Sequence, residues 1–505
     1  MWEKITNYYK QNPLPTILFV ALIIRLISVI FAKGYGMHDD HFLIIESSRS
    51  WADGFDYNNW LPASQGPNAK PEGHSLLYPI ISFCLFKVLA FLGVTSLDTQ
   101  MYFIRFIHAL FSLLTIYFGY KITDKVSSNT KAANIVGWAL ALYWCMPWFS
   151  VRNLVEIVCI PFLLWSTWLY IKEDKHKVSN IIYSGIVMGI AASFRFQVIF
   201  FIGGFGLAML IYKQWKEAAI WAIAILIAFF ITQSVDLYFW KRPFAEMQEY
   251  FAYNFSHAND YLTGGWHKYL GVIIGVLLPP ISVLLFFGFI YGYKRLFLFL
   301  PAFCFLFFHS IFPNKQERFI FPILPSVIIL GVIGLYDLIK KYSQYKWIRK
   351  TILICFWISL VLNIILIVPT TVHYSKRSKV ETMVYLSKYK NMGAFAIENT
   401  NKNSVSMFPR GYLGQWIDYY EITNKNANDW TKEVKITPSF FIFEGKENLE
   451  KRVASVKEKY PNLEYETTIE TSFIDQLLQD INRNSKNYRT YIYRNKDIFP
   501  NKQEK

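Results

Sequence analysis

The stretch "HSIFPNKQERFIFPILP", residues 309–325, lies between two long apolar runs and interrupts them with charge. Lys315, Glu317 and Arg318 fall within four consecutive positions of this stretch. Charged side chains are costly at the edge of a bilayer unless a partner neutralises them, so we expect the two cations to meet an anion there. The stretch therefore predicts a membrane protein that carries a cationic binding site.

The composition of the chain agrees with a membrane location. Of its 505 residues, 53% are hydrophobic and only 17% are charged, whereas soluble domains contain about 25% charged residues. The first apolar run, "PTILFVALIIRLISVIFA" at 15–32, has a long core and no small-residue cleavage site. It therefore predicts a membrane helix and not a cleaved signal peptide.

The apolar runs predict a polytopic helical membrane protein with about 11–13 spans. One further run, 75–93, disturbs the parity of the crossings. Either this run is re-entrant, or one of the short spans within 180–213 is misassigned. The other runs fall near 14–32, 101–120, 132–148, 155–171, 180–194, 196–213, 217–235, 270–290, 296–311, 319–339 and 349–369.

The net charge of +16 is concentrated in short loops between the apolar runs, such as 340–350. This distribution follows the positive-inside pattern of cytoplasmic loops, so nucleic acid is excluded as a partner. With the basic loops inside, the loops 33–74, 236–269 and 312–318 and the chain after His373 are expected outside. The five cysteines lie in or beside apolar runs, which favours small core hydrophobes over disulfides or metal ligands.

The composition changes to that of a soluble domain after about residue 375. We therefore expect a membrane catalytic domain at 1–373 and a small extracytoplasmic α/β domain at 374–505. The patterns in the second domain predict strands and helices in alternation. The strands are expected at 439–445, 465–471 and 488–495, and the helices at 446–460 and 473–484.

The first outer loop contains the acidic motif "DDHFLIIE", residues 39–46. Positions i and i+7 share one face of an α-helix, so Asp39 and Glu46 are expected to face one cleft. A carboxylate shielded from bulk water there suits a general base, whereas a solvated loop start would show the same letters. The run 38–41, His-Asp-Asp-His, also suits Zn²⁺ or Mn²⁺, but adjacent aspartates diverge on a helix and no further ligand pair follows.

Three arginines, Arg25, Arg105 and Arg195, interrupt apolar runs. Buried arginines usually face a cavity or a partner, although Arg195 at a helix end also suits snorkelling to the headgroups. Together with Lys315 and Arg318 they favour an anion-binding cavity. A lipid-linked phosphate is the natural anion at that depth, because guanidinium groups match phosphate oxygens.

The outer loop 236–269 mixes aromatic rings with polar side chains, including Tyr261, Trp266 and His267. Rings beside hydrogen-bonding groups suit a sugar, which stacks through its C–H faces. Interfacial aromatic belts give the same pattern, so the loop alone leaves both interpretations open.

These segments, in this order, resemble the GT-C glycosyltransferases, and specifically the family 22 α-mannosyltransferases that use dolichol-phosphate-mannose. Members carry Asp-Glu, an aromatic residue and then Glu after the first helix, and "DDHFLIIE" supplies Asp39, Asp40, Phe42 and Glu46 with Asp in place of the first Glu. "GHSLLYPIIS", "IRFIHALFS", "ASFRFQ" and "YLTGGWHKY" resemble further family segments.

The stretch at 314–325 carries the most specific part of the resemblance. The family shows His-Lys-Glu-x-Arg-Phe before an apolar residue, an aromatic, Pro and Leu-Pro. "NKQERFIFPILP" keeps Lys315 and Arg318, while Asn314 replaces the His and Gln316 replaces the Glu. The family's Arg-Thr-Leu-Thr-Asn is met only in part by "RNLVE", where Glu156 stands in the Asn position.

The resemblance implies an inverting glycosyltransferase that moves a sugar, by resemblance mannose, from a polyprenyl- or dolichyl-phosphate to a glycan or glycolipid acceptor on the non-cytoplasmic face. Asp39 would be the base, with Asp40 next in line, and no metal or cofactor is expected. The resemblance also implies two sets of binding residues. The donor phosphate would be bound by Lys315, Arg318, Arg195 and Arg105, and the sugar or acceptor would be bound by Glu46, Trp266, His267, Tyr261 and Gln316.

Two other functions fit the same features. A flippase or transporter of a lipid-linked glycan would also need cavity arginines, but such proteins tend to show internal repeats, which we do not find. A glycan polymerase or ligase would use a diphosphate-linked oligosaccharide. The expected location is the inner membrane in a bacterium or the endoplasmic reticulum membrane in a eukaryote.

Overall fold

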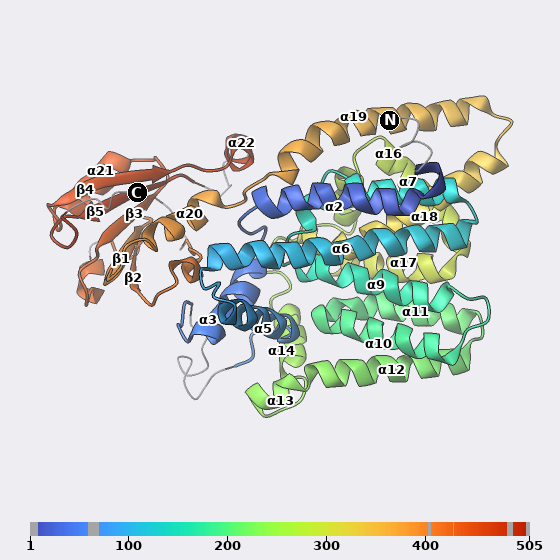
Figure 1. Cartoon of the computed structure of the whole chain (residues 1–505), viewed down its shortest axis with the longest axis horizontal. Helices are drawn as coiled ribbons and strands as arrows, with labels where there is room; N and C mark the ends of the chain where they lie inside the picture. Colours follow the sequence, from blue (N-terminus) through green and yellow to red (C-terminus); the bar gives the residue numbers. More distant parts are fainter. Residues whose placement is uncertain (1–8, 59–69, 402–405, 428, 482–487, 501–505) are drawn as a thin grey trace. The chain divides into compact units, whose positions relative to one another are not determined.

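The computed structural model of the chain describes residues 9–58, 70–401, 406–427, 429–481 and 488–500 (Figure 1). The contacts divide the chain into two compact units. The helical unit comprises Met1–Ile30, Ala69–Ile81 and Ile104–Val372, and the mixed unit comprises Phe31–Asn68, Ser82–Phe103 and His373–Lys505. The chain that follows the last membrane helix therefore joins two N-terminal segments that the sequence prediction assigned to the membrane domain.

All eleven predicted membrane runs contain helix, because a helix satisfies the backbone hydrogen bonds of an apolar stretch internally, but the runs 132–148 and 270–290 are each divided into two helices. In Figure 1, α9, α10 and α12 lie side by side within the helical unit. The helices are α2 (Pro13–Phe31), α6 (Leu97–Ser127), α7 (Thr130–Leu142), α8 (Met146–Phe149), α9 (Val155–Ile171), α10 (Val178–Phe194), η2 (Phe196–Val198), α11 (Ile199–Ile211), α12 (Trp215–Gln233), α15 (Lys268–Val276), α16 (Ile281–Tyr291), α17 (Leu296–Ile311), η4 (Glu317–Ile323), α18 (Leu324–Lys341) and α19 (Lys346–Thr371).

Five helices of the described part are long and apolar enough to cross a membrane: α2, α6, α12, α18 with η4, and α19. The run 270–290 is not one straight helix as predicted, since the chain bends by 118° between α15 and α16, which would give a sixth span as a pair. Pro279 and Pro280 lie at the break, where proline cannot donate the backbone hydrogen bond that a helix needs. Five apolar helices are shorter, among them α5 (Leu77–Phe91), which occupies the ambiguous run 75–93.

Glycines let several helices of this unit meet backbone to backbone. A Cβ on Gly334 of α18 would lie 1.9 Å from the carbonyl oxygen of Gly288 of α16, and one on Gly288 would lie 2.2 Å from that of Gly331. Gly185 and Gly189 of α10 approach α12 in the same way. Without a hydrophobic driving force between helices in lipid, such close van der Waals contact is a main source of association.

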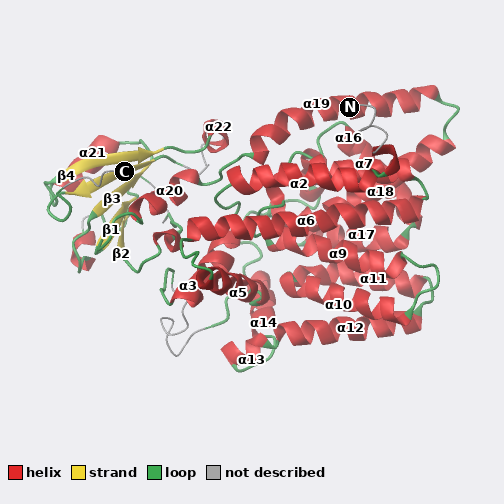
Figure 2. Ribbon diagram, viewed as in Figure 1, coloured by secondary structure: helices red, strands yellow, loops and turns green. Residues whose placement is uncertain are grey.

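The mixed unit contains one five-stranded sheet (Figure 2) of β1 (Ala394–Glu398), β2 (Asp418–Ile422), β3 (Phe440–Glu444), β4 (Leu463–Ile469) and β5 (Thr490–Asn495). The strand order is β2-β1-β3-β5-β4, with β1 parallel to β2 and β3, and β5 antiparallel to β3 and β4. Helix α21 (Leu449–Lys457) packs on the face that carries Phe441 and Phe443. Helix α20 (Arg377–Leu386) lies against the other face, where Thr382 hydrogen-bonds Thr490.

The elements predicted for the C-terminal domain are confirmed as β3, α21, β4, α22 (Phe473–Ile481) and β5, although residues 482–484 of the predicted second helix lie outside the described part. The strands β1 and β2 and the helix α20 were not predicted. The N-terminal segments of this unit form a π-helix, η1 (Asp40–Glu46), and α3 (Ser47–Asp53). The loop 236–269 of the helical unit contains α13 (Val235–Trp240) and α14 (Ala245–Ser256).

Candidate functional site

The two aspartates of the acidic motif point in different directions. Asp40 is buried, and its carboxylate accepts hydrogen bonds from the backbone N–H groups of Gly36 at 2.8 Å and Met37 at 3.0 Å. The side chain of Asp39 is 41% exposed and lies 3.7 Å from the ring of His38. Asp40 therefore closes the turn before η1, while Asp39 is the more accessible carboxylate.

The expectation that Asp39 and Glu46 face one cleft is wrong. The segment between them is a π-helix, in which hydrogen bonds span five residues, so seven residues no longer complete two turns. Glu46 is fully buried, whereas Asp39 is half-exposed. Within the described residues, no group of three or more His, Cys, Asp or Glu side chains is arranged to hold a metal ion.

Glu46 is held by a segment from the C-terminal part of the mixed unit. Its carboxylate accepts the backbone N–H of Gly411 at 2.6 Å and a hydrogen bond from the side-chain amide of Asn58. Arg410 donates to the other end of that amide at 2.8 Å. The segment 407–416 thus contacts the acidic motif through Glu46. No role was predicted for this segment from the sequence.

The predicted cations Arg195 and Arg318 are brought together in the helical unit. Arg195 forms an ion pair with Glu156 in the first turn of α9, and Arg318 Nε lies 3.7 Å from the same carboxylate. Both guanidinium groups lie over the ring of Phe319, at 5.3 Å and 5.5 Å. Gln316 accepts a hydrogen bond from Arg318 Nε at 3.0 Å.

Sequence reasoning noted Glu156 only as a substitution in a family motif and missed its role as the counter-charge of two arginines. The helix dipole stabilises an acidic residue in the first turn of a helix, and this position of Glu156 was the one signal of its role that the sequence offered. Among the described residues, Glu156 Oε2 and Arg195 Nε are buried and have no hydrogen-bond partner. The cluster therefore keeps hydrogen-bonding capacity that the protein itself does not use.

Lys315 is buried beside this cluster but directs its ammonium group at the end of α17. It donates to the carbonyl oxygens of His309 and Ser310, each at 2.8 Å, and to that of Phe312. The last carbonyls of a helix lack intrahelical partners, so a cation is stabilising at this position. Burial and the nearby charge of Lys268 lower the pKa of Lys315.

The structure joins the two motifs at 261–269 and 314–318. Thr263 and Asn314 form an isolated antiparallel bridge, and Lys268 donates to the carbonyl oxygen of Lys315 at 2.8 Å. Tyr269 donates to the carbonyl oxygen of Gln316 at 3.2 Å. The bridge leaves three predicted sugar-site residues exposed at the surface of this loop pair: Tyr261, Trp266 and His267.

Arg105 occupies a different environment from the Arg195–Arg318 pair. It is buried in α6 and donates from Nε to the carbonyl oxygen of Val29 at 2.9 Å. Arg25 of α2 donates to Ser112 at 2.8 Å and to the carbonyl oxygens of Leu140 and Ala141. These arginines therefore satisfy helix backbone that would otherwise be unpaired.

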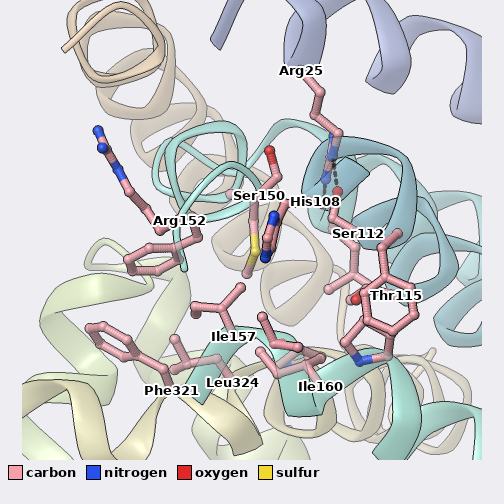
Figure 3. Close-up of a pocket in the computed structure, with 17 residues that line it drawn as sticks. Arg25, His108, Ser112, Thr115, Ser150, Arg152, Ile157, Ile160, Phe321 and Leu324 are labelled. Carbon is pink, nitrogen blue, oxygen red and sulfur yellow. Dashed lines mark hydrogen bonds between the residues drawn. The ribbon is translucent and has the colours of Figure 1, made fainter. Parts of the chain in front are cut away.

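A cavity of about 40 Å³ lies within the helical unit (Figure 3), with Arg25 directed at Ser112 on its border. Its lining is mostly apolar and also includes His108 and Ser150. A space of this size accommodates a few water molecules, which need polar partners of this kind. Neither Arg195 nor Arg318 is among the residues that line it.

The sequence pattern of the Alg9-like mannosyltransferase family matches residues 16–408, which is most of the chain. No curated protein sequence matches the chain significantly. Among solved structures, ArnT from Cupriavidus metallidurans bound to undecaprenyl phosphate superposes with a TM-score of 0.60 and 13% identity, over 95% of this chain and 97% of that chain.

Two further structures agree on the fold. Apo ArnT from the same organism gives a TM-score of 0.60 at 12% identity, covering 96% of this chain and 98% of that one. The Archaeoglobus fulgidus oligosaccharyltransferase complexed with Zn and sulfate gives 0.50 at 13% identity, covering 90% and 71%. These likenesses confirm the expected GT-C fold, and the family match confirms the expected enzyme class. The chain belongs to the Alg9-like mannosyltransferase family and is a multi-pass membrane glycosyltransferase.

Proposed function

We propose that this glycosyltransferase moves a mannosyl group from a polyprenyl-phosphate carrier to a hydroxyl of a glycan or glycolipid, on the non-cytoplasmic face and with inversion. The observation that carries the proposal is the buried pair of Arg195 and Arg318, in which the N–H of Arg195 Nε has no hydrogen-bond partner. The family match to mannosyltransferases supports the choice of sugar. The relative ArnT, whose structure holds undecaprenyl phosphate, supports the choice of carrier.

In the proposed reaction, the acceptor oxygen bonds to the anomeric carbon while the bond from that carbon to the phosphate oxygen breaks. The acceptor proton moves to a carboxylate, and the carrier leaves as a polyprenyl phosphate. Because negative charge develops on the departing phosphate, fixed cations nearby lower the barrier without a metal.

Asp39 is the better candidate for the base. Both oxygens of Asp40 already accept backbone N–H groups, and a carboxylate stabilised in this way is a weaker proton acceptor. Asp39 keeps its side chain half-exposed at the start of η1. Asp40 then acts by fixing the turn that carries Asp39.

Arg195 and Arg318 are the proposed phosphate ligands, since guanidinium groups bind phosphate oxygens bidentately. Lys315 supports them indirectly, because its ammonium group fixes the end of α17 and the loop before Arg318. We assign Arg105 to the support of α2, where its recorded hydrogen bond lies. The exposed Tyr261, Trp266 and His267 remain the proposed sugar and acceptor contacts, together with Gln316, whose carbonyl oxygen accepts a hydrogen bond from Tyr269.

The test uses the purified protein in lipid nanodiscs with polyprenyl-phosphate carrying radiolabelled mannose and a panel of acceptor glycans. We expect transfer by the wild type and at least a hundredfold slower transfer by Asp39→Asn, since general base catalysis contributes about 10²–10⁴-fold. Asp39→Asn should unfold at the same temperature as the wild type. Asp40→Asn should unfold at a lower temperature, because it loses a hydrogen bond from a backbone N–H group.

For the phosphate site, Arg195→Gln and Arg318→Gln should weaken donor binding, while Arg295→Gln should not. Arg295 lies in a basic loop and forms an ion pair with Asp337 of α18. The variant Arg295→Gln therefore removes the same charge outside the proposed site. Transfer that persists in Asp39→Asn but disappears in Asp40→Asn would move the base by one residue. Transfer only from a diphosphate-linked oligosaccharide would instead favour a polymerase or ligase.

A further inference from the structure

Helix α22 (labelled in Figure 1) exposes its apolar side and buries a polar one. Phe473 is 77% exposed and Ile481 is 75% exposed, with Leu477 and Leu478 at 46% and 47%. On a helix with 3.6 residues per turn, positions i, i+4, i+5 and i+8 fall on one broad face. A helix packed on a water-soluble domain shows the opposite arrangement, with its apolar face turned inward.

The protein-facing side of α22 is fixed by a carboxylate. Asp475 is almost fully buried and accepts the backbone N–H of Lys376 at 2.9 Å, and it lies 3.3 Å from the ring of His373. Its backbone N–H also donates to the hydroxyl oxygen of Ser472, which caps the first turn of α22. The orientation of the apolar face is therefore determined by the residues that hold Asp475.

Those residues directly follow a membrane span. Helix α19 ends at Thr371, and its apolar side chains are exposed almost along its whole length, including Val368 near its end. His373 is the second residue after α19, and a chain extends by at most about 3.6 Å per residue. The groups that hold Asp475 are thus tethered within a few residues of the point where the chain leaves the hydrocarbon.

We propose that α22 is an in-plane membrane anchor whose apolar face enters the headgroup region of the bilayer. Its nine residues rise only about 14 Å, at roughly 1.5 Å per residue, which is too short to cross a membrane and suited to lying along its surface. The anchor attaches the mixed unit to the lipid surface in addition to its covalent links to the helical unit. It would restrict how the sheet tilts over the bilayer where a lipid-linked acceptor arrives.

The test places a fluorescent probe on each side of α22 in the full-length protein. In a variant with its own cysteines replaced, Leu477→Cys and Ile481→Cys are labelled separately with an environment-sensitive dye and reconstituted at one copy per nanodisc. Gln476→Cys, which is exposed but lies outside the apolar face of the same helix, is the matched control. Lipids with a spin label near the headgroup should quench both apolar-side probes several-fold more than the control.

A second measurement separates anchoring from folding. The double substitution Leu477→Asp with Ile481→Asp should release a probe at Phe473→Cys from lipid quenching and leave the unfolding temperature unchanged, since this face touches little protein. Equal, weak quenching at all three cysteines would overturn the proposal in favour of a solvent-exposed face. Probes that are shielded but not quenched by lipid would also overturn it, in favour of a second copy or a bound acceptor.

Discussion

Glu156 is the residue on which the cationic cluster depends, since it faces two guanidinium groups in a buried setting. Removing one member of a buried ion pair leaves the other charge without compensation. The desolvation cost of that charge then appears as lost stability. Glu156 also holds both arginines in place before any phosphate arrives, which lowers the entropy cost of binding a phosphate.

We predict that Glu156→Gln and Arg195→Gln each lower the free energy of unfolding by about 3 kcal/mol, and that the double variant loses less than the sum. Thermal unfolding of the four proteins in one detergent measures the coupling. The exposed pair Glu173 and Lys177 provides the control, for which no measurable change is expected. Additive losses at the buried pair would show that the contact is not coupled.

Glu246 gives a pH dependence at the residue scale. Burial raises its pKa to about 7, although its carboxylate accepts N–H groups from Gly73, His74 and Trp240. Since the folded protein binds this proton more tightly than the unfolded chain, its stabilising contribution is complete below the unfolded pKa near 4.5. The contribution is lost as the pH rises towards the folded value.

We therefore predict that the stability advantage of the wild type over Glu246→Gln is largest near pH 5 and declines as the pH approaches 7. Unfolding temperatures of both proteins across this range measure the difference. A wild-type advantage that grows with pH would contradict the predicted direction.

At the scale of elements, the glycine contacts between α16 and α18 fix how closely these helices pack. Gly334→Ala would drive a methyl group into the carbonyl of Gly288, and overpacking of this kind costs about 1–3 kcal/mol. Gly203→Ala in α11 meets nothing within 4 Å and should stabilise the protein by up to about 1 kcal/mol through helix propensity. The unfolding temperatures of the two variants measure these effects. A shift of both temperatures in the same direction would contradict this account.

At the scale of the whole molecule, the mixed unit is assembled from three separate stretches of chain. Cutting the chain after Val372 would remove Gly411, a backbone donor to Glu46. A buried carboxylate that loses a donor is destabilised. We predict that such a truncation is inactive and exposes residues 31–58 to protease, while the spans of the helical unit still insert. A truncated protein that keeps this segment protected would show that the segment folds without the sheet.

The sequence predicted the membrane helices because a long apolar run carries one strong signal. It missed β1, "AFAIE", because two of its five residues are alanines, which are depleted in strands, whereas the equally buried β3, "FFIFE", is rich in aromatic residues. Helix α20 begins with three polar residues, Arg377, Ser378 and Lys379, so its start resembles a loop.

The candidate site was predicted only in part. Arg195 and Arg318 were found as cations within or beside apolar runs, but their shared partner Glu156 is distant in sequence, and no spacing rule connects them. The attachment of Lys315 to the end of α17 depends on side-chain direction, which the letters do not specify.

The π-helix at Asp40–Glu46 makes the length of this segment as important as its letters. A π-turn holds more residues than an α-turn, so loss of one residue, for example Leu43, would let the backbone return to ordinary α-helical bonding. At about 100° per residue of α-helix, Asp39 and Glu46 would then stand six residues and about 600° apart, which is about 120° short of two full turns. A single deletion here would therefore leave every acidic letter of the motif intact without bringing the two carboxylates to one face, and an alignment that closes such a gap would equate segments with different backbone bonding.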